Sequence, residues 1–254
     1  MNAAATDVYL FRPDPTRLAI TPAQRAATRI VGVLYLIQMA VAIFGESFVR
    51  GRLLVRDAAQ TAQNIIAHEG LFRLSIAGDL FVYTGVIVLA WAFYVLVRPI
   101  NRNLALLALL FRLVENAVLC LATVNALVAL KLLSAPAYLK AFETTQLHSL
   151  ARLALNAQGL TMNVGFILLG LGSTVFAYLL LKSCYVPKTI AVLGICASLV
   201  LAVVTLAIIV FPRLAALGLT YMVPMFFYEV GLGLWLVVKG IRAPHSPASD
   251  DLSP

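Results

Sequence analysis

Charged residues are scarce in this sequence. Its 254 residues include 19 Lys or Arg and 11 Asp or Glu, so that only 12% of the chain is charged, whereas 62% is hydrophobic. A soluble domain usually has about 25% charged and about 45–50% apolar residues, so this composition excludes a protein whose surface lies mainly in water. The apolar excess, with a mean hydropathy of +0.95, predicts an integral membrane protein.

Residues and motifs with recognisable chemistry are also few. The three cysteines, Cys120, Cys184 and Cys196, have no metal-ligand spacing, and none of the three histidines lies within an apolar run. No HExxH, GxSxG, Walker or dinucleotide-binding motif occurs. We therefore expect no cofactor and no metal site. No catalytic residue can be assigned, and whether the chain is an enzyme stays open.

The excess of basic residues gives a net charge of +8. In a soluble protein this charge would suggest nucleic acid as a partner. Here the basic residues form short clusters at the ends of apolar runs, where positive charge contacts anionic lipid headgroups and sets the topology. The expected partners are therefore membrane lipids, together with a small-molecule or lipid ligand, and not nucleic acid.

Six apolar runs are long enough to cross about 30 Å of hydrocarbon at 1.5 Å per residue. They predict an all-α, polytopic membrane helix bundle of about six transmembrane helices. Residues 1–24 are expected to be a cytoplasmic N-terminal tail, 25–242 the transmembrane domain and 243–254 a disordered C-terminal tail. The six runs lie at Ala27–Phe48, Leu71–Val97, Asn103–Leu133, Leu153–Leu181, Thr189–Phe211 and Ala216–Val238.

An even number of spans places both termini on one side, and the basic residues favour that side, so we expect a multi-pass protein of the cell membrane with cytoplasmic termini. Two longer connections on the outer side predict two short interfacial helices. In the first, Asp57 is a suitable N-cap, Gln60 follows three residues later and Gly70 can end the helix. The second has an apolar side made of Leu139, Phe142, Leu147 and Leu150.

Ionisable side chains inside the predicted spans are the strongest sign of function. Such a group costs several kcal/mol in hydrocarbon, so it needs a partner or a water-filled cavity. In the third span Arg112, Glu115 and Asn116 share one helical face with Thr123. Arg112 and Glu115 are three residues apart and can form an ion pair. This face is expected to point into the bundle.

Four other spans add polar side chains at overlapping depths, among them Tyr35 in the first span and Asn156 in the fourth. We interpret the whole set as a polar cavity open to the outer side, with four carboxylates set against Arg73 and Arg112. The predicted ligand-binding residues are Arg112, Glu115, Asn116, Glu229, Asp79, Tyr83, Asn163 and Glu46.

Such a cavity would bind a small molecule or a lipid headgroup, either for transport or for sensing. One alternative is an intramembrane enzyme, a hydrolase or isomerase that uses paired carboxylates as acid and base. Another is a structural membrane scaffold, in which the polar side chains only form hydrogen bonds between helices. The sequence does not decide the oligomeric state.

Several short motifs occur in a recognisable order between about Arg25 and Gly240. They are RIVGVLYL from Arg29, FRLVE from Phe111, VPK from Val186 followed by Leu193-Gly194, and Tyr228-Glu229 followed by LWL and Lys239-Gly240. Together they resemble an uncharacterised six-helix bacterial membrane family, domain of unknown function 4386. The resemblance implies a bacterial inner-membrane setting, and it supplies no activity.

Overall fold

The structure is a computed structural model that describes residues 20–134 and 141–242, and every regular element in these ranges is a helix. Six helical segments are long and apolar enough to cross a membrane. The predicted all-α bundle of six transmembrane helices is therefore confirmed. The segments are Pro22–Leu53, Glu69–Val97, Arg102–Leu133, Thr144–Ser183, Lys188–Val210 and Thr220–Val238.

The first span contains three consecutive helical elements and the last span two. The elements are α1 (Pro22–Ile43), the π-helical η2 (Phe44–Arg50), α2 (Gly51–Leu53), α3 (Ala58–Ala67), α4 (Glu69–Val97), α5 (Arg102–Leu133), α6 (Thr144–Ser183), α7 (Lys188–Val210), the 3-10 helices η4 (Pro212–Leu217) and η5 (Thr220–Met222), and α8 (Val223–Val238).

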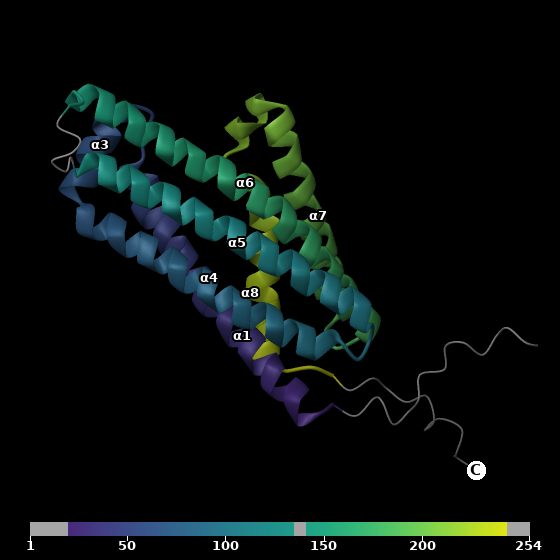
Figure 1. The fold of residues 1–254 in the computed structure, drawn as a ribbon. Helices are drawn as coiled ribbons and strands as arrows, with labels where there is room; N and C mark the ends of the chain where they lie inside the picture. The colour runs from purple at the N-terminus through teal and green to yellow at the C-terminus, as the bar shows by residue number, and fades with distance from the viewer. Residues whose placement is uncertain (1–19, 135–140, 243–254) are drawn as a thin grey trace, which may run out of the picture.

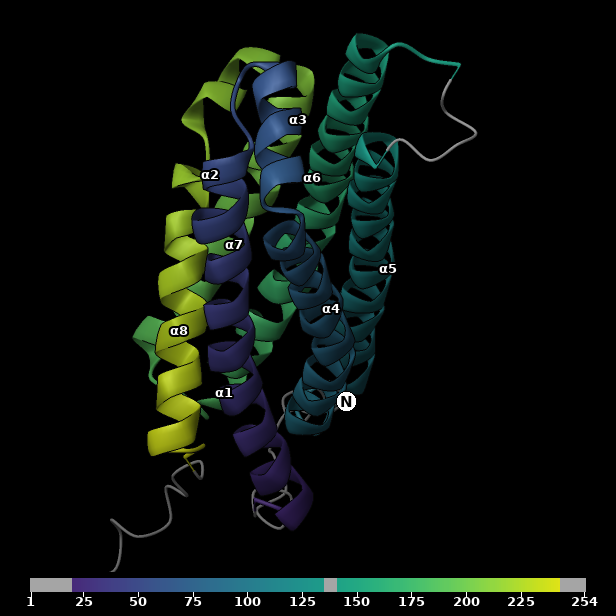
Figure 2. The same cartoon turned by 90° about the vertical axis from the view of Figure 1, so that its left-hand side faces the viewer.

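The six spans form a closed helical ring in the order of the sequence. Each of α1, α4, α5, α6 and α7 packs against the span that follows it, and α8 packs back against α1. Figure 2 shows α1, α7 and α8 on one side of the ring and α4 and α5 on the other. Helix α1 begins, and α8 ends, at the same end of the bundle, here named the terminal end (Figure 1). The opposite end carries α3 and is named the α3 end.

Glycines allow the helices of the ring to approach closely. A Cβ atom at Gly32 of α1 would lie 3.0 Å from the carbonyl oxygen of Gly233 in α8. A Cβ atom at Gly170 of α6 would lie 2.5 Å from the carbonyl oxygen of Ser198 in α7. Small residues at crossings are how membrane helices gain van der Waals contact, because lipid supplies no hydrophobic drive for association.

The apolar core is interrupted at mid-height. One buried apolar cluster lies towards the terminal end and a second towards the α3 end. On α5 the first cluster ends at Ala108 and the second begins at Ala126. The buried residues of α5 between these two are Arg112, Glu115, Asn116, Leu119, Ala122 and Thr123. A mainly polar layer therefore separates the two apolar clusters on this helix.

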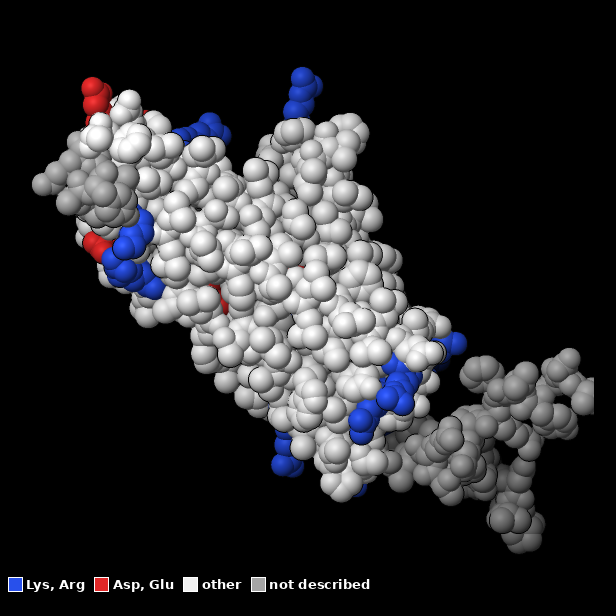
Figure 3. Space-filling view, in the orientation of Figure 1, with Lys and Arg blue, Asp and Glu red and all other residues white. Residues whose placement is uncertain are grey.

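The outer surface of the ring is apolar. Large side chains such as Leu121, Leu160, Val203 and Val238 are more than half exposed. In Figure 3 the basic and acidic residues gather near the two ends, and the belt between them is almost entirely uncharged. This distribution fits a belt in contact with lipid tails and two ends in contact with headgroups and water.

Most span boundaries fall within a few residues of the prediction, but the first helix starts earlier. Residues 22–24 were expected to belong to the N-terminal tail, and they form the first turn of α1 instead. The reason is a capping box, in which Thr21 accepts from the Gln24 backbone and Gln24 from the Thr21 backbone, with Pro22 at the first helical position. The rest of that tail, residues 1–19, and the predicted C-terminal tail, 243–254, lie outside the described residues.

The first interfacial helix exists as α3, and Asp57 is its N-cap, accepting from the Gln60 backbone at 2.7 Å. It ends at Ala67, ahead of the predicted Gly70, because α4 already begins at Glu69.

The second interfacial helix was predicted wrongly as a separate element. Leu147 and Leu150 lie in the first turns of α6, because Glu143 and Gln146 form a capping box that starts this long helix at Thr144. Leu139 lies outside the described residues.

Candidate functional site

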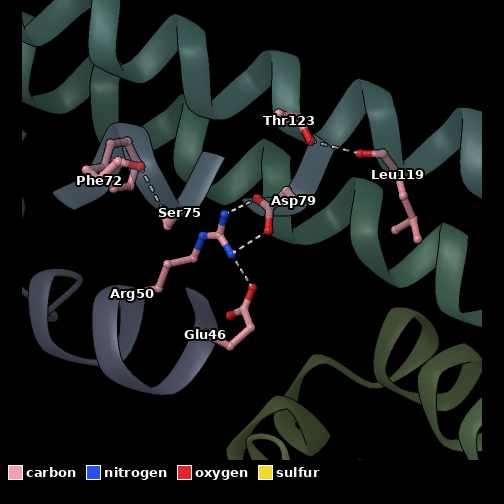
Figure 4. A network of polar contacts seen from close by, with 7 residues as sticks. All are labelled: Glu46, Arg50, Phe72, Ser75, Asp79, Leu119 and Thr123. Carbon is pink, nitrogen blue, oxygen red and sulfur yellow. Dashed lines mark hydrogen bonds and ion pairs between the residues drawn. The ribbon is translucent and has the colours of Figure 1, made fainter. Parts of the chain in front are cut away.

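Two groups of polar side chains lie within the membrane-spanning part of the ring. The first, named the α3-end group, consists of Glu46, Arg50, Asp79 and Tyr83. The Arg50 guanidinium donates to Glu46 at 2.6 Å and to both carboxylate oxygens of Asp79, one of them at 3.2 Å (Figure 4). Tyr83 lies one turn further along α4, and its electrostatic neighbours are Asp79, Arg50 and Glu46.

The π-helical segment η2 supplies two members of this group. Glu46 and Arg50 both belong to η2, and Asp79 belongs to α4. Gly45 also belongs to η2, and a Cβ atom there would be 3.6 Å from Arg50 Nη1 and 3.9 Å from Asp79 Oδ1. Stretches of π-helix are rare and often occur at functional sites. Here the π-helix carries a buried guanidinium, of which only 6% is exposed, against the neighbouring span.

The second group, named the central group, is built on α5. Arg112 Nη1 lies 2.9 Å from Glu115 Oε2, which confirms the predicted ion pair between these residues. The contact lacks the angles of a hydrogen bond. Arg112 Nη1 and Glu115 Oε2 are therefore buried with this ion-pair contact and no hydrogen bond, and Asn116 Oδ1 is buried without a hydrogen-bond partner among the described residues. The three side chains are 1–5% exposed, so the face is buried in the bundle as predicted.

Helices α1 and α8 bring three more side chains to the central group. Besides Glu115, the side chains that interact electrostatically with Arg112 are Tyr35 of α1 and Tyr228 and Glu229 of α8. Glu229 is half-buried, and no cation lies within ion-pairing distance of it in the part of the chain that the structure describes.

Glycines of α6 and α7 make room for this arrangement. A Cβ atom at Gly172 would lie 3.3 Å from Arg112 Cδ, and one at Gly194 would lie 2.4 Å from Tyr228 Cε2. Both side chains therefore pass directly over a helix backbone. On the side of the terminal end, the Tyr35 ring packs edge-on against Phe93, with 5.7 Å between the ring centroids. Phe93 in turn stacks on Phe176, with 4.8 Å between the centroids.

Seven of the eight predicted site residues belong to one or other of these two groups. Arg112, Glu115, Asn116 and Glu229 belong to the central group, and Glu46, Asp79 and Tyr83 to the α3-end group. At 1.5 Å per residue from the α4–α5 turn, Asp79 lies about 27 Å and Arg112 about 15 Å along the bundle. Tyr83 and Asn116 both lie about 21 Å along it, so the two groups adjoin at mid-height. Asn163 of α6 is half-buried, and no hydrogen bond or ion pair links it to either group within 20–134 and 141–242.

Two sequence-based expectations about these charges were wrong. Arg73, expected to face the carboxylates, is exposed and pairs with Glu69 at 2.7 Å. Its expected place is taken by Arg50, which lies beyond the predicted end of the first span at Phe48. The usable signal was the spacing of Glu46 and Arg50 by four residues, with no helix breaker between them.

The buried amides were also misjudged. Asn156, expected among the polar groups of the fourth span, is exposed, whereas Gln158 is 5% exposed and Gln38 of α1 is 6% exposed. Gln38 Nε2 has no hydrogen-bond partner among the described residues, and a Cβ atom at Gly85 of α4 would lie 2.4 Å from it. Glutamines in an apolar run signal such positions, but neither Gln38 nor Gln158 was among the predicted site residues.

Each group contains one arginine and two carboxylates. Arg50 is shared by Glu46 and Asp79, and Arg112 pairs with Glu115 near Glu229. If all six side chains are ionised, each group carries one negative charge that no protein cation balances. In a low-dielectric interior such a charge attracts a positive ligand or a proton.

Comparison with known proteins gives a family and no activity. The family described as "Domain of unknown function (DUF4386)" matches residues 30–240. A curated protein of Archaeoglobus fulgidus, described as "Uncharacterized protein", is 27% identical over 168 residues, which cover 65% of this chain and 83% of that protein. No solved structure matches. The match extends over most of the chain and all six spans, so the resemblance in the sequence is confirmed, and the chain belongs to the DUF4386 family.

Proposed function

We propose that this multi-pass membrane protein binds a small polar molecule or a lipid headgroup inside its helical ring, for transport or for sensing. The observation that carries the proposal is on α5, where Asn116 Oδ1 is buried without a partner. Beside it Arg112 Nη1 and Glu115 Oε2 contact only each other, at 2.9 Å and without hydrogen-bond geometry. Native proteins pair nearly all buried polar atoms, so an unpaired set at one place calls for an additional partner. A bound polar ligand would be that partner.

The scaffold alternative accounts less well for the central group. Side chains that only hold helices together gain their energy from hydrogen bonds, and an unmade buried hydrogen bond costs about 1–3 kcal/mol. The α3-end group fits a structural role better, because Arg50 donates to carboxylates on both sides and only its Nε is buried without a partner among the described residues. We therefore assign ligand binding to the central group and structural support to the α3-end group.

The α3 end is the proposed route of entry. The side chain of Glu46 is 34% exposed, whereas Arg50 beside it is 6% exposed and Glu115 of the central group is 2% exposed. Glu46 of the α3-end group is therefore the most exposed of these three side chains. With both termini in the cytoplasm, as the basic residues favour, the site would open to the outer side of the membrane.

Native mass spectrometry of the purified full-length protein tests this proposal. We expect a polar molecule or lipid to be retained by the wild-type protein and lost from the Glu229→Gln variant, with little change in thermal unfolding because Glu229 has no ion pair to break. The matched control is Glu69→Gln, which removes an exposed carboxylate at the α3 end. A Glu229→Gln protein that unfolds more easily and retains the same molecules would support the scaffold instead. Chemical conversion of the retained molecule would indicate an enzyme.

A further inference from the structure

We infer that the ligand of the central group presents a primary ammonium group. This inference rests on the proposed function and names the chemical class that the site takes. It combines three features of the described residues: the balance of charge, the identity of the unpaired atoms, and the side chains around them.

The charge balance favours a cation. The central group contains the arginine Arg112 and the carboxylates Glu115 and Glu229, and only Glu115 is paired with the arginine. With both carboxylates ionised, an anionic ligand would raise the uncompensated charge in the membrane interior from one to two. A monovalent cation placed near Glu229 would bring the sum to zero, which is the state that a low-dielectric environment favours.

The unpaired atoms favour a donor with several N–H groups. Asn116 Oδ1 is an acceptor without a partner, and Glu115 Oε2 has only the Arg112 contact at 2.9 Å, which lacks hydrogen-bond geometry. Both belong to side chains at least nine-tenths buried. The Glu229 carboxylate, which interacts electrostatically with Glu115, adds a third acceptor group. A primary ammonium has three N–H donors and no acceptor, so its donors match these acceptors in number and kind.

The surroundings favour an organic cation over a metal ion. No group of three or more His, Cys, Asp or Glu side chains is arranged to hold a metal within residues 20–134 and 141–242. The rings of Tyr35 and Tyr228 belong to the same group, and aromatic rings attract ammonium ions through their π-electrons. The ammonium can belong to a free small amine or to an amphiphile whose chain stays in the lipid.

Binding of defined probes to the purified full-length protein tests the inference. At pH 7.5 and constant ionic strength, ethylammonium, decylammonium, tetramethylammonium and acetate are titrated separately, with sodium chloride as the reference. We expect a primary ammonium to raise the unfolding temperature and to bind saturably. Tetramethylammonium should bind at least about tenfold more weakly, because it lacks the N–H donors that form hydrogen bonds to charged acceptors. Tighter binding of ethylammonium indicates a small free amine, and tighter binding of decylammonium indicates a membrane amphiphile.

Two variants test whether the primary ammonium binds at the central group. Glu229→Gln and Asn116→Leu should each weaken primary ammonium binding about tenfold or more, and Glu69→Gln should leave it unchanged. Asn116→Leu removes an unpaired buried acceptor, so it should fold at least as stably as the wild type and remains decisive if Glu229→Gln does not fold.

Equal affinity for tetramethylammonium, sodium and the primary amines would overturn the inference, as would primary amine binding that both variants retain. Binding of acetate in place of ammonium would overturn it and leave the proposed function standing. If no probe binds and no molecule co-purifies, the proposed function itself fails.

Discussion

Arg50 donates to both carboxylate oxygens of Asp79, and this contact joins the π-helical end of the first span to α4. Glu46 receives a further hydrogen bond from the same guanidinium four residues earlier on its own helix. One buried side chain therefore links two neighbouring members of the helical ring near the α3 end. The stability of the ring at this end should depend on it.

Arg50→Gln should destabilise the protein by roughly 3 kcal/mol, because removing one partner of a buried ion pair leaves the other charge uncompensated. Thermal unfolding in detergent measures the loss. Arg73→Gln is the matched control, since the Arg73–Glu69 pair is exposed and such pairs contribute at most about 1 kcal/mol. Equal effects of the two substitutions would show that Arg50 has no special role.

The Arg112–Glu115 ion pair predicts a non-additive pair of substitutions. Arg112→Leu alone should cost about 3–5 kcal/mol, because Glu115 then remains buried without its partner. The double variant Arg112→Leu with Glu115→Leu should recover most of this loss, since apolar replacements of a whole buried pair are often neutral or stabilising. Chemical denaturation of the wild type, the two single variants and the double variant in one detergent gives a double-mutant cycle. Additive losses of unfolding free energy would contradict the expectation.

Two glycines in membrane-spanning helices should respond oppositely to alanine. Gly194→Ala places a Cβ atom 2.4 Å from the Tyr228 ring, so the ring must move, at a cost of about 1–3 kcal/mol. Gly231→Ala meets nothing within 4 Å and should stabilise α8 by roughly 0.5–1 kcal/mol. Paired melting curves test both, and a loss of stability at Gly231 would argue against the packing described for α8.

Tyr185, in the turn between α6 and α7, should give the protein a dependence on alkaline pH. It is 6% exposed, and burial raises the pKa of its hydroxyl above 10, although the hydrogen bond donated by Gln24 Nε2 at 3.0 Å opposes the rise. Above about pH 10 the unfolded state ionises while the folded state stays neutral, so stability falls as the pH rises through this range. Tyr185→Phe should show a shallower decline between about pH 9 and 11, and identical pH profiles would refute this expectation.

Periodicity and hydropathy were sufficient to predict the six spans, because each is long and carries few charges. They also placed Arg112, Glu115 and Asn116 on one buried face, since an α-helix fixes which residues share a side. What they could not supply was the departure from α-helical geometry at η2, which continues the first span beyond Phe48 and brings Arg50 into the bundle. Contacts between helices, such as Tyr228 over Gly194, are set by packing and leave no periodic trace in the sequence.

The order of the helical ring has a consequence for biosynthesis. Every span packs against the span made just before it, so each nascent helix meets its neighbour as soon as it enters the bilayer, and only the contact of α8 with α1 waits for the last segment of the chain. Until then α5 has to reside in lipid without Glu229 and Tyr228. Its arginine and glutamate can neutralise each other on the same helix, so the most polar span does not depend on the last one for insertion.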